Sequence, residues 1–231
     1  MPKIPTVFNW SGGKDSTLAL HNVLNQSKYD VRYLLTTVNN HHDRVAMHGV
    51  RASLLRNQVA ALNIPLIEVR LPESPDMETY EQEMNAHLER LKIEGIEYAI
   101  FGDIFLEDLK VYREQQLTKI GMKAVFPLWK RNSLAVVKEF INLGYQTIVV
   151  CTQDCLQDFC GRVIDQSFLD DLPADIDPCG ENGEFHTFVF DGPIFEKQIE
   201  FTIGEKVYKT FPNPTGDSIV SGYWYIDLLP S

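Results

Sequence analysis

The first two thirds of the chain alternates short apolar runs with longer segments whose apolar residues recur at helical spacing. The runs over 7–10, 31–38, 65–69, 98–101 and 147–152 predict strands. The segments 16–24, 48–62, 77–91, 106–120 and 134–143 predict helices, most of them followed closely by Gly, Asn or Pro. Because each parallel crossover needs a helix-sized connection, this order predicts an α/β protein with a Rossmann-like, five-stranded parallel sheet.

The pattern changes after about residue 167. The segments FHTFVFDG, IEFTIGEKVYKTF and GYWYIDLL alternate apolar and polar residues with the period of two that is typical of antiparallel strands. We therefore expect an α/β domain over 1–166 and a small β-rich subdomain over 167–231. The aromatic stripe in GYWYIDLL fits either an antiparallel strand or a homodimer contact.

Composition and charge narrow the class of protein. The 231 residues are 44% hydrophobic and 23% charged, which is typical of a globular chain large enough to fold without disulfides. The formal charge of −11 disfavours tight binding to nucleic acid, which needs clustered Lys and Arg. No stretch approaches 18 apolar residues and the first ten residues contain no apolar leader, so we expect no membrane partner and a cytoplasmic location.

The strongest local signal lies between the first predicted strand and the first predicted helix. Adjacent glycines let the backbone turn tightly and approach a ligand closely. The helix that follows directs its free N–H groups and the positive end of its dipole at the same point. The segment therefore predicts a polyphosphate cradle, and its residues are Ser11, Gly12, Gly13, Lys14, Asp15 and Ser16.

Further candidates follow other predicted strands. Gly102 and Asp103 come directly after the fourth strand, at the edge where ligands of parallel sheets bind, and the carboxylate there could hold Mg²⁺ or orient an acceptor. His48 opens the second helix, where a helix cap is the alternative. Glu181 and Glu184 lie three apart in a Gly-rich loop, where they could bind an amine, accept its proton or hold a metal.

Three of the four cysteines form the pattern C-x3-C-x4-C at the end of the fifth predicted strand: Cys151, Cys155 and Cys160. This spacing matches neither paired zinc ligands nor the common iron–sulfur patterns. Together with Cys179 they are too few for a disulfide scaffold, and reduced thiols are expected. Sulfur transfer through these thiols remains a rival interpretation.

Several segments resemble known proteins. SGGKDS resembles the PP-loop of the ATP pyrophosphatases, which convert ATP to AMP and pyrophosphate while adenylating a substrate. The segments MHGVR (47–51), FGDI (101–104), PLW (127–129) and DPCGENGEFHTFVFDGPIF (177–195) are similar to the diphthine–ammonia ligase family within that superfamily. The resemblance spans residues 6 to about 195.

This resemblance implies an ATP-dependent, amide-forming ligase that uses Mg²⁺. A substrate carboxylate, on protein-borne diphthine or on a small metabolite, would be adenylated and then attacked by ammonia or an amine. The resemblance assigns ATP binding to Ser11–Ser16 and Gly102, and an adenine pocket to Thr37, Val38 and Asn39. It assigns the acceptor site to the C-terminal subdomain.

The same resemblance implies the catalytic set, in which Lys14 stabilises charge on the phosphates. That set comprises Lys14, Asp103, Glu181, Glu184 and His186. His48 and Trp129 would contact the acceptor, although a Pro-Leu-Trp corner also fits a core position. The family usually has Glu where this chain has His186, a change that alters which acceptor the pocket prefers. The alternatives are a sulfur-transferring enzyme of tRNA modification and a non-catalytic adenine-nucleotide-binding module.

Overall fold

The computed structural model describes residues 2–46, 48–212 and 220–231 and contains two sheets. In sheet A, five parallel strands lie in the order β4-β2-β1-β5-β6, and β3 adds an antiparallel pair to the end of β2. Sheet B is antiparallel with the order β8-β7-β10-β9. The strands of sheet A are β1 (Ile4–Asn9), β2 (Tyr29–Asn39), β3 (Arg44–Val45), β4 (Leu66–Leu71), β5 (Tyr98–Ile100) and β6 (Lys123–Val125). Those of sheet B are β7 (Gln146–Gln153), β8 (Phe185–Asp191), β9 (Phe201–Pro212) and β10 (Val220–Pro230).

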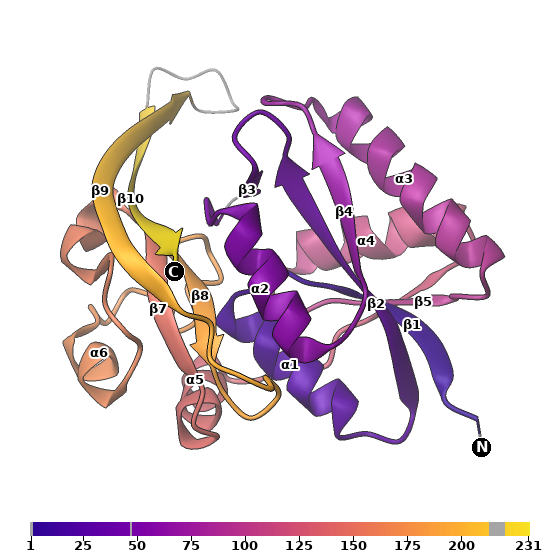
Figure 1. Ribbon diagram of the computed structural model, residues 1–231, viewed down its shortest axis with the longest axis horizontal. Coiled ribbons are helices and arrows are strands. Elements are labelled where there is room, and N and C mark those ends of the chain that lie inside the picture. Colours follow the sequence, from indigo (N-terminus) through magenta and orange to yellow (C-terminus); the bar gives the residue numbers. More distant parts are fainter. Residues whose placement is uncertain (1, 47, 213–219) are drawn as a thin grey trace.

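Helices cover both faces of sheet A. The helices of the described chain are α1 (Lys14–Leu24), α2 (Ala52–Leu62), α3 (Met77–Ile93), α4 (Glu107–Lys119), α5 (Ser133–Asn142) and α6 (Gln166–Asp171), with a 3-10 helix η1 (Asp154–Phe159). Of these, α6 and η1 lie beside sheet B (Figure 1). Figure 1 shows α1 and α2 between the two sheets and α3 and α4 on the far side of sheet A. None of the helices in the described ranges combines the length and apolarity needed to cross a bilayer.

Two hydrophobic clusters correspond to the two faces of sheet A. Adjacent residues of β1 point to opposite sides, as in any strand, so Phe8 joins the cluster shared with α1, α2 and sheet B, and Val7 joins the cluster under α3 and α4. Both side chains are fully buried. The larger cluster is continuous from sheet A to sheet B, and this continuity fixes the C-terminal strands against the loops at the carboxyl edge of sheet A.

Side chains near the helix ends explain several boundaries. Asp76 and Asn132 precede α3 and α5, and their side chains accept the N–H groups of Thr79 and Ala135 at 2.8 and 3.0 Å. Asn63 ends α2 in the left-handed conformation, with φ of 52°.

The α/β class and the mainly parallel sheet are confirmed, but the identity of the fifth strand was wrong. The predicted strand 147–152 is β7, which pairs antiparallel with β8 and β10 in sheet B. The fifth parallel strand is β6, whose three residues are too few to give a periodic signal. Sheet B thus includes a strand from before residue 166, and the division at 166/167 stays a prediction.

Candidate active site at the carboxyl edge of sheet A

The segment SGGKDS connects β1 to α1 at the carboxyl edge of sheet A. Gly12 has φ of 78°, a left-handed conformation that L side chains rarely adopt. Its carbonyl accepts hydrogen bonds from the N–H of Val189 at 2.9 Å and from Nε2 of Gln58 at 3.0 Å. A Cβ at Gly12 would lie 2.5 Å from Oε1 of Gln58. The turn is therefore held from β8 and α2, and a side chain does not fit.

The N-terminus of α1 opens toward the loop. The N–H of Lys14 donates to Oγ1 of Thr187 at 3.0 Å, so β8 caps one of the free donors. Among the described residues, no acceptor is paired with the backbone N–H of Asp15 or Ser16. The hydroxyl oxygens of Ser11 and Ser16 lie 3.0 Å apart beside these donors. Free N–H groups, hydroxyls and a helix dipole at one point favour an anion.

The loop after β5 lies against this helix terminus. A Cβ at Gly102 would lie 2.9 Å from the backbone nitrogen of Ser16, so only glycine allows this approach. The carboxylate of Asp103 forms an ion pair with Arg113 of α4, with 3.0 Å between Oδ2 and Nε. Asp103 therefore lies at the predicted edge but is neutralised by a cation on the neighbouring helix.

The side chain of Lys14 is buried, with 3% exposure. Its Nζ donates to Oδ2 of Asp15 at 2.8 Å and to the carbonyl oxygen of Cys179, and it lies 5.1 Å from the ring centre of Phe185. Burial alone lowers the pKa of Lys14, but attraction to Asp15 and Glu181 raises it above its ordinary value. Lys14 is therefore a buried cation that connects the two loops.

The loop between α6 and β8 carries two acids, of which Glu181 attracts the Lys14 ammonium. Oε1 of Glu181 accepts the N–H of Ile104 at 2.7 Å, directly after Asp103. Burial, with repulsion from Asp15 and Asp103, raises the pKa of Glu181 to about 7. Oε1 of Glu184 accepts from the N–H of Asp177 and from Nδ2 of Asn182.

The second oxygen of Glu184 behaves differently from the first. Its Oε2 is buried and has no hydrogen-bond partner among the described residues. A buried polar atom without a partner is costly, so this oxygen is available to a ligand that donates a hydrogen bond.

Two histidines lie over the loop of residues 11–16. The rings of His48 and His186 lie against each other with 4.7 Å between their centres and a tilt of 33°, and Nδ1 of His48 lies 3.0 Å from the carbonyl oxygen of Thr187. Burial lowers the pKa of His48 to about 4 and that of His186 to about 3, where His48 and Lys14 add repulsion. Both rings are therefore neutral near pH 7. The first residue of the MHGVR segment, residue 47, lies outside the described residues.

The remaining predicted site residues lie elsewhere on the edge. Thr37, Val38 and Asn39 end β2, where Val38 is buried and the carbonyl of Thr37 accepts the N–H of Ala46. Trp129 follows β6 and packs against Phe126, 5.7 Å between ring centres. None of these four residues makes a hydrogen bond to the PP-loop among the described residues.

Sequence reasoning missed three residues that support the site. Thr187 caps α1, Gln58 holds the turn at Gly12, and Arg113 neutralises Asp103. Thr187 is adjacent to the predicted His186 within a motif segment, so it could have been found. Gln58 and Arg113 carry no sequence signal, since each is an ordinary polar residue within a helix.

Matches to known proteins cover most of the chain. Residues 5–124 match the model of the diphthamide synthase N-terminal domain, and residues 132–213 match that of the diphthamide synthase C-terminal domain. The diphthine–ammonia ligase of Homo sapiens is 23% identical over 175 residues, which is 72% of this chain and 64% of that protein. The Bos taurus enzyme of the same name is 25% identical over the same shares, and that of Rattus norvegicus is 24% identical over 76% of this chain and 67% of its own length.

The chain thus spans 64% of the human and bovine relatives that it matches. The two domain models together cover sheet A with its PP-loop and most of sheet B, including the loop that bears Glu181 and Glu184. The chain belongs to the diphthamide synthase family.

Proposed function

We propose that this chain is an ATP-dependent ligase that forms an amide from a substrate carboxylate and ammonia or an amine. The observation that carries the proposal is the junction of two loops at Lys14. The PP-loop supplies anion-binding groups, and the loop over 177–184 adds acids that suit an amine. The proposal agrees with the names of the relatives, which are diphthine–ammonia ligases.

ATP would bind with its phosphates on Ser11–Ser16. The free N–H groups of Asp15 and Ser16 and the hydroxyl of Ser11 are the donors, and Lys14 is the cation that stabilises charge on the phosphates as it develops. The ends of β2 and β5, with Thr37, Val38, Asn39 and Gly102, remain the predicted surroundings of the nucleotide. Adenylation of the carboxylate, with pyrophosphate as leaving group, follows the superfamily pattern that SGGKDS resembles.

The donor set also fits Mg²⁺. Oδ1 of Asp15 is buried without a hydrogen-bond partner among the described residues, and hard cations prefer such oxygens. Asp103 would have to leave Arg113 to bind a metal, whereas Oδ1 of Asp15 is not engaged. Asp15 and Asp103 would hold the ion, which when bound would neutralise phosphate charge.

The acceptor half of the site would use Glu181, Glu184 and His186. A carboxylate whose pKa is about 7 can accept a proton from an ammonium ion at neutral pH, which suits Glu181 to that role. The unpartnered Oε2 of Glu184 would accept a hydrogen bond from the amine. His48 and Trp129 stay predicted acceptor contacts. A neutral His186, in place of the usual Glu, favours an acceptor that does not require an anion there.

The cysteines disfavour the sulfur-transfer alternative. Cys151 and Cys160 are buried, and burial raises their pKa to about 12 and about 11. The thiolate is the nucleophile in sulfur chemistry, so both would be protonated and inert near pH 7. Cys155 is exposed, and the other three cysteines are buried.

The test is to incubate the protein with labelled ATP, Mg²⁺, candidate carboxylates and ammonium. AMP and pyrophosphate that form only with carboxylate and ammonium support the ligase, and ADP would contradict it. Dependence on tRNA and a sulfur donor would favour the rival function. Glu184→Gln, which keeps the size of the side chain, should retain ATP affinity while slowing amide formation about 100-fold or more.

The matched control for Glu184→Gln is Glu83→Gln on the exposed face of α3, which should change neither quantity. If Glu184→Gln abolishes ATP binding, Glu184 belongs to the nucleotide site instead. If it changes nothing, the proposed division into two half-sites is wrong.

A further inference from the structure

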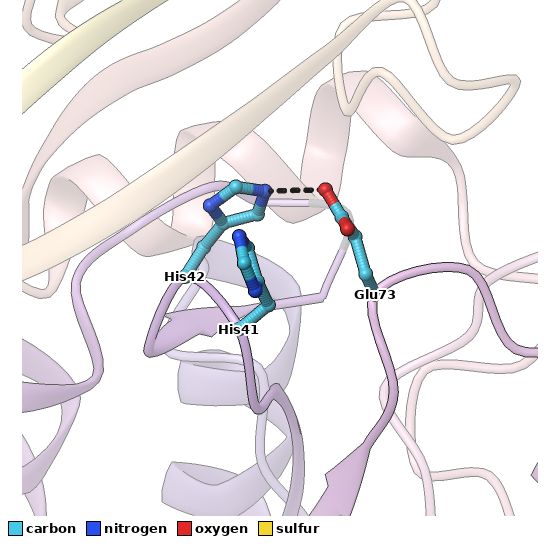
Figure 2. Close-up of side chains that lie close together, drawn as sticks. All are labelled: His41, His42 and Glu73. Atoms are coloured by element: carbon cyan, nitrogen blue, oxygen red, sulfur yellow. Dashed lines mark hydrogen bonds and ion pairs between the residues drawn. The ribbon is translucent and has the colours of Figure 1, made fainter.

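Two histidines and a glutamate outside the proposed active site lie together at the edge of sheet A. His41 and His42 belong to the turn between β2 and β3, and Glu73 lies two residues after β4. Figure 2 shows the three side chains directed into one space between the two segments. Their candidate ligand atoms all lie within 4.8 Å of one another, and Nε2 of His42 is 3.2 Å from Oε1 of Glu73.

The backbone around these side chains is fixed by Asn39. Its Oδ1 accepts the N–H groups of both His41 and His42 at 3.0 Å, an Asx turn, and its Nδ2 donates to the carbonyl oxygen of Glu73 at 3.0 Å. The N–H of Asn40 donates to the carbonyl oxygen of Leu71, which joins the same two segments again. The Asn39 side chain therefore positions the backbone of all three residues. The cluster is held in place by these hydrogen bonds and not only by the conformations of its own side chains.

The donor set has a definite chemistry. Two imidazoles and one carboxylate suit divalent first-row ions of the borderline class, such as Zn²⁺, and are a poor set for Mg²⁺ or Ca²⁺, which prefer oxygen alone. Tetrahedral zinc with bonds near 2.1 Å places its ligand atoms about 3.4 Å apart. Rotation of exposed side chains covers the difference, and the side chains of His42 and Glu73 are 50% and 58% exposed.

We propose that His41, His42 and Glu73 bind a divalent transition-metal ion of the borderline class, which ties the β2–β3 turn to the segment after β4. Three protein ligands leave at least one position for water or another ligand. Among the described residues, none of these three side chains forms a hydrogen bond or ion pair with the loop over 11–16 or the loop over 177–184, so the site is tested separately from the proposed ligase activity.

The experiment uses the full chain, freed of metal with a chelator and titrated with Zn²⁺ by calorimetry. All proteins carry Cys155→Ser, since the exposed thiol is a competing ligand. We expect one Zn²⁺ at this site, with about 10-fold or greater loss of affinity in both His42→Ala and Glu73→Gln. Zn²⁺ should also raise the thermal midpoint of the parent, and this increase should be lost in His42→Ala.

The matched control is His87→Ala, which removes a half-buried histidine on α3 and should leave zinc affinity unchanged. Zinc that binds His42→Ala and Glu73→Gln as tightly as the parent would overturn the proposal, and so would absence of binding to the parent. In either case His42 and Glu73 form an ordinary surface hydrogen bond. Circular dichroism of each variant verifies that it is folded.

Discussion

Glu181→Gln should stabilise the protein, and the gain should depend on pH. Burial raises the pKa of Glu181 to about 7 from an ordinary 4.5. The folded protein therefore holds this proton more tightly than the unfolded chain, and the free energy of unfolding falls as pH rises from 4.5 to 7. Glutamine has the same shape, keeps an oxygen for the N–H of Ile104, and never ionises.

The size of the gain follows from the two pKa values. Each pKa unit corresponds to about 1.36 kcal/mol. The raised pKa of Glu181 therefore lowers the free energy of unfolding of the parent by about 3 kcal/mol above pH 7. At pH 5 the carboxyl is mostly ionised in the unfolded chain but still protonated in the folded protein. The free energy of unfolding of the variant should therefore exceed that of the parent by only about 1 kcal/mol at this pH. His48 and His186 also have shifted pKa values, but Glu181 is not among the causes of those shifts, so their contributions cancel in the difference.

The assay is urea unfolding of both proteins at pH 5, 6, 7 and 8, with the free energy of unfolding extrapolated to water. Amide formation should fall in the same variant if Glu181 accepts the proton of the amine, so stability and activity should move in opposite directions. Glu83→Gln on α3 is the control for removing an exposed carboxylate. An equal stability difference at pH 5 and pH 8 would refute the inference that Glu181 is desolvated.

Three further perturbations address other parts of the site. Gly13→Ala should fold, since φ of −90° suits alanine. It should weaken ATP binding measured by calorimetry, because its Cβ would lie 2.9 Å from Cε1 of His48 and would crowd the loop. Unchanged affinity would remove the loop from the nucleotide site. His186→Glu should change the preferred acceptor in a substrate panel more than the dissociation constant for ATP, and the reverse ranking would contradict the assignment of His186 to the acceptor. Joint replacement of cysteines 151, 155 and 160 by Ser should lower stability but leave AMP formation intact; a folded variant that forms AMP and transfers no group would restore the sulfur-transfer interpretation.

Local patterns were sufficient for the helices and for the position of the loop over residues 11–16. The five predicted helices correspond to α1 to α5, because helical periodicity and capping residues such as Asp76 and Asn132 act within a few positions of one another. The turn at Gly12 and the helix that follows depend likewise on local backbone conformation, so SGGKDS could be placed between β1 and α1 from the sequence.

The pairing of strands could not be read in the same way. β7 is an interior strand whose residues from Thr147 to Thr152 are all buried, and such a run fits a parallel sheet covered on both faces equally well. Its antiparallel partners β8 and β10 lie more than 30 residues further along the chain, and no local signal identifies them. β6 has only three residues, and its place as the fifth parallel strand is set by its pairing with the neighbouring strand β5.

The sequence by itself determined the α/β class, the turn over residues 11–16 between β1 and α1, and the presence of acids at 181 and 184, since each depends on residue type and short-range order. Only the tertiary structure decided that the carbonyl of Cys179 meets the Lys14 ammonium, that Thr187 caps α1 and that Arg113 neutralises Asp103. These contacts join segments up to 173 residues apart. The contacts of Cys179 and Thr187 exist because the apolar cluster between sheet B and α1 and α2 is continuous. Burial of apolar area is not directional, so a single sequence does not reveal which segments it brings together.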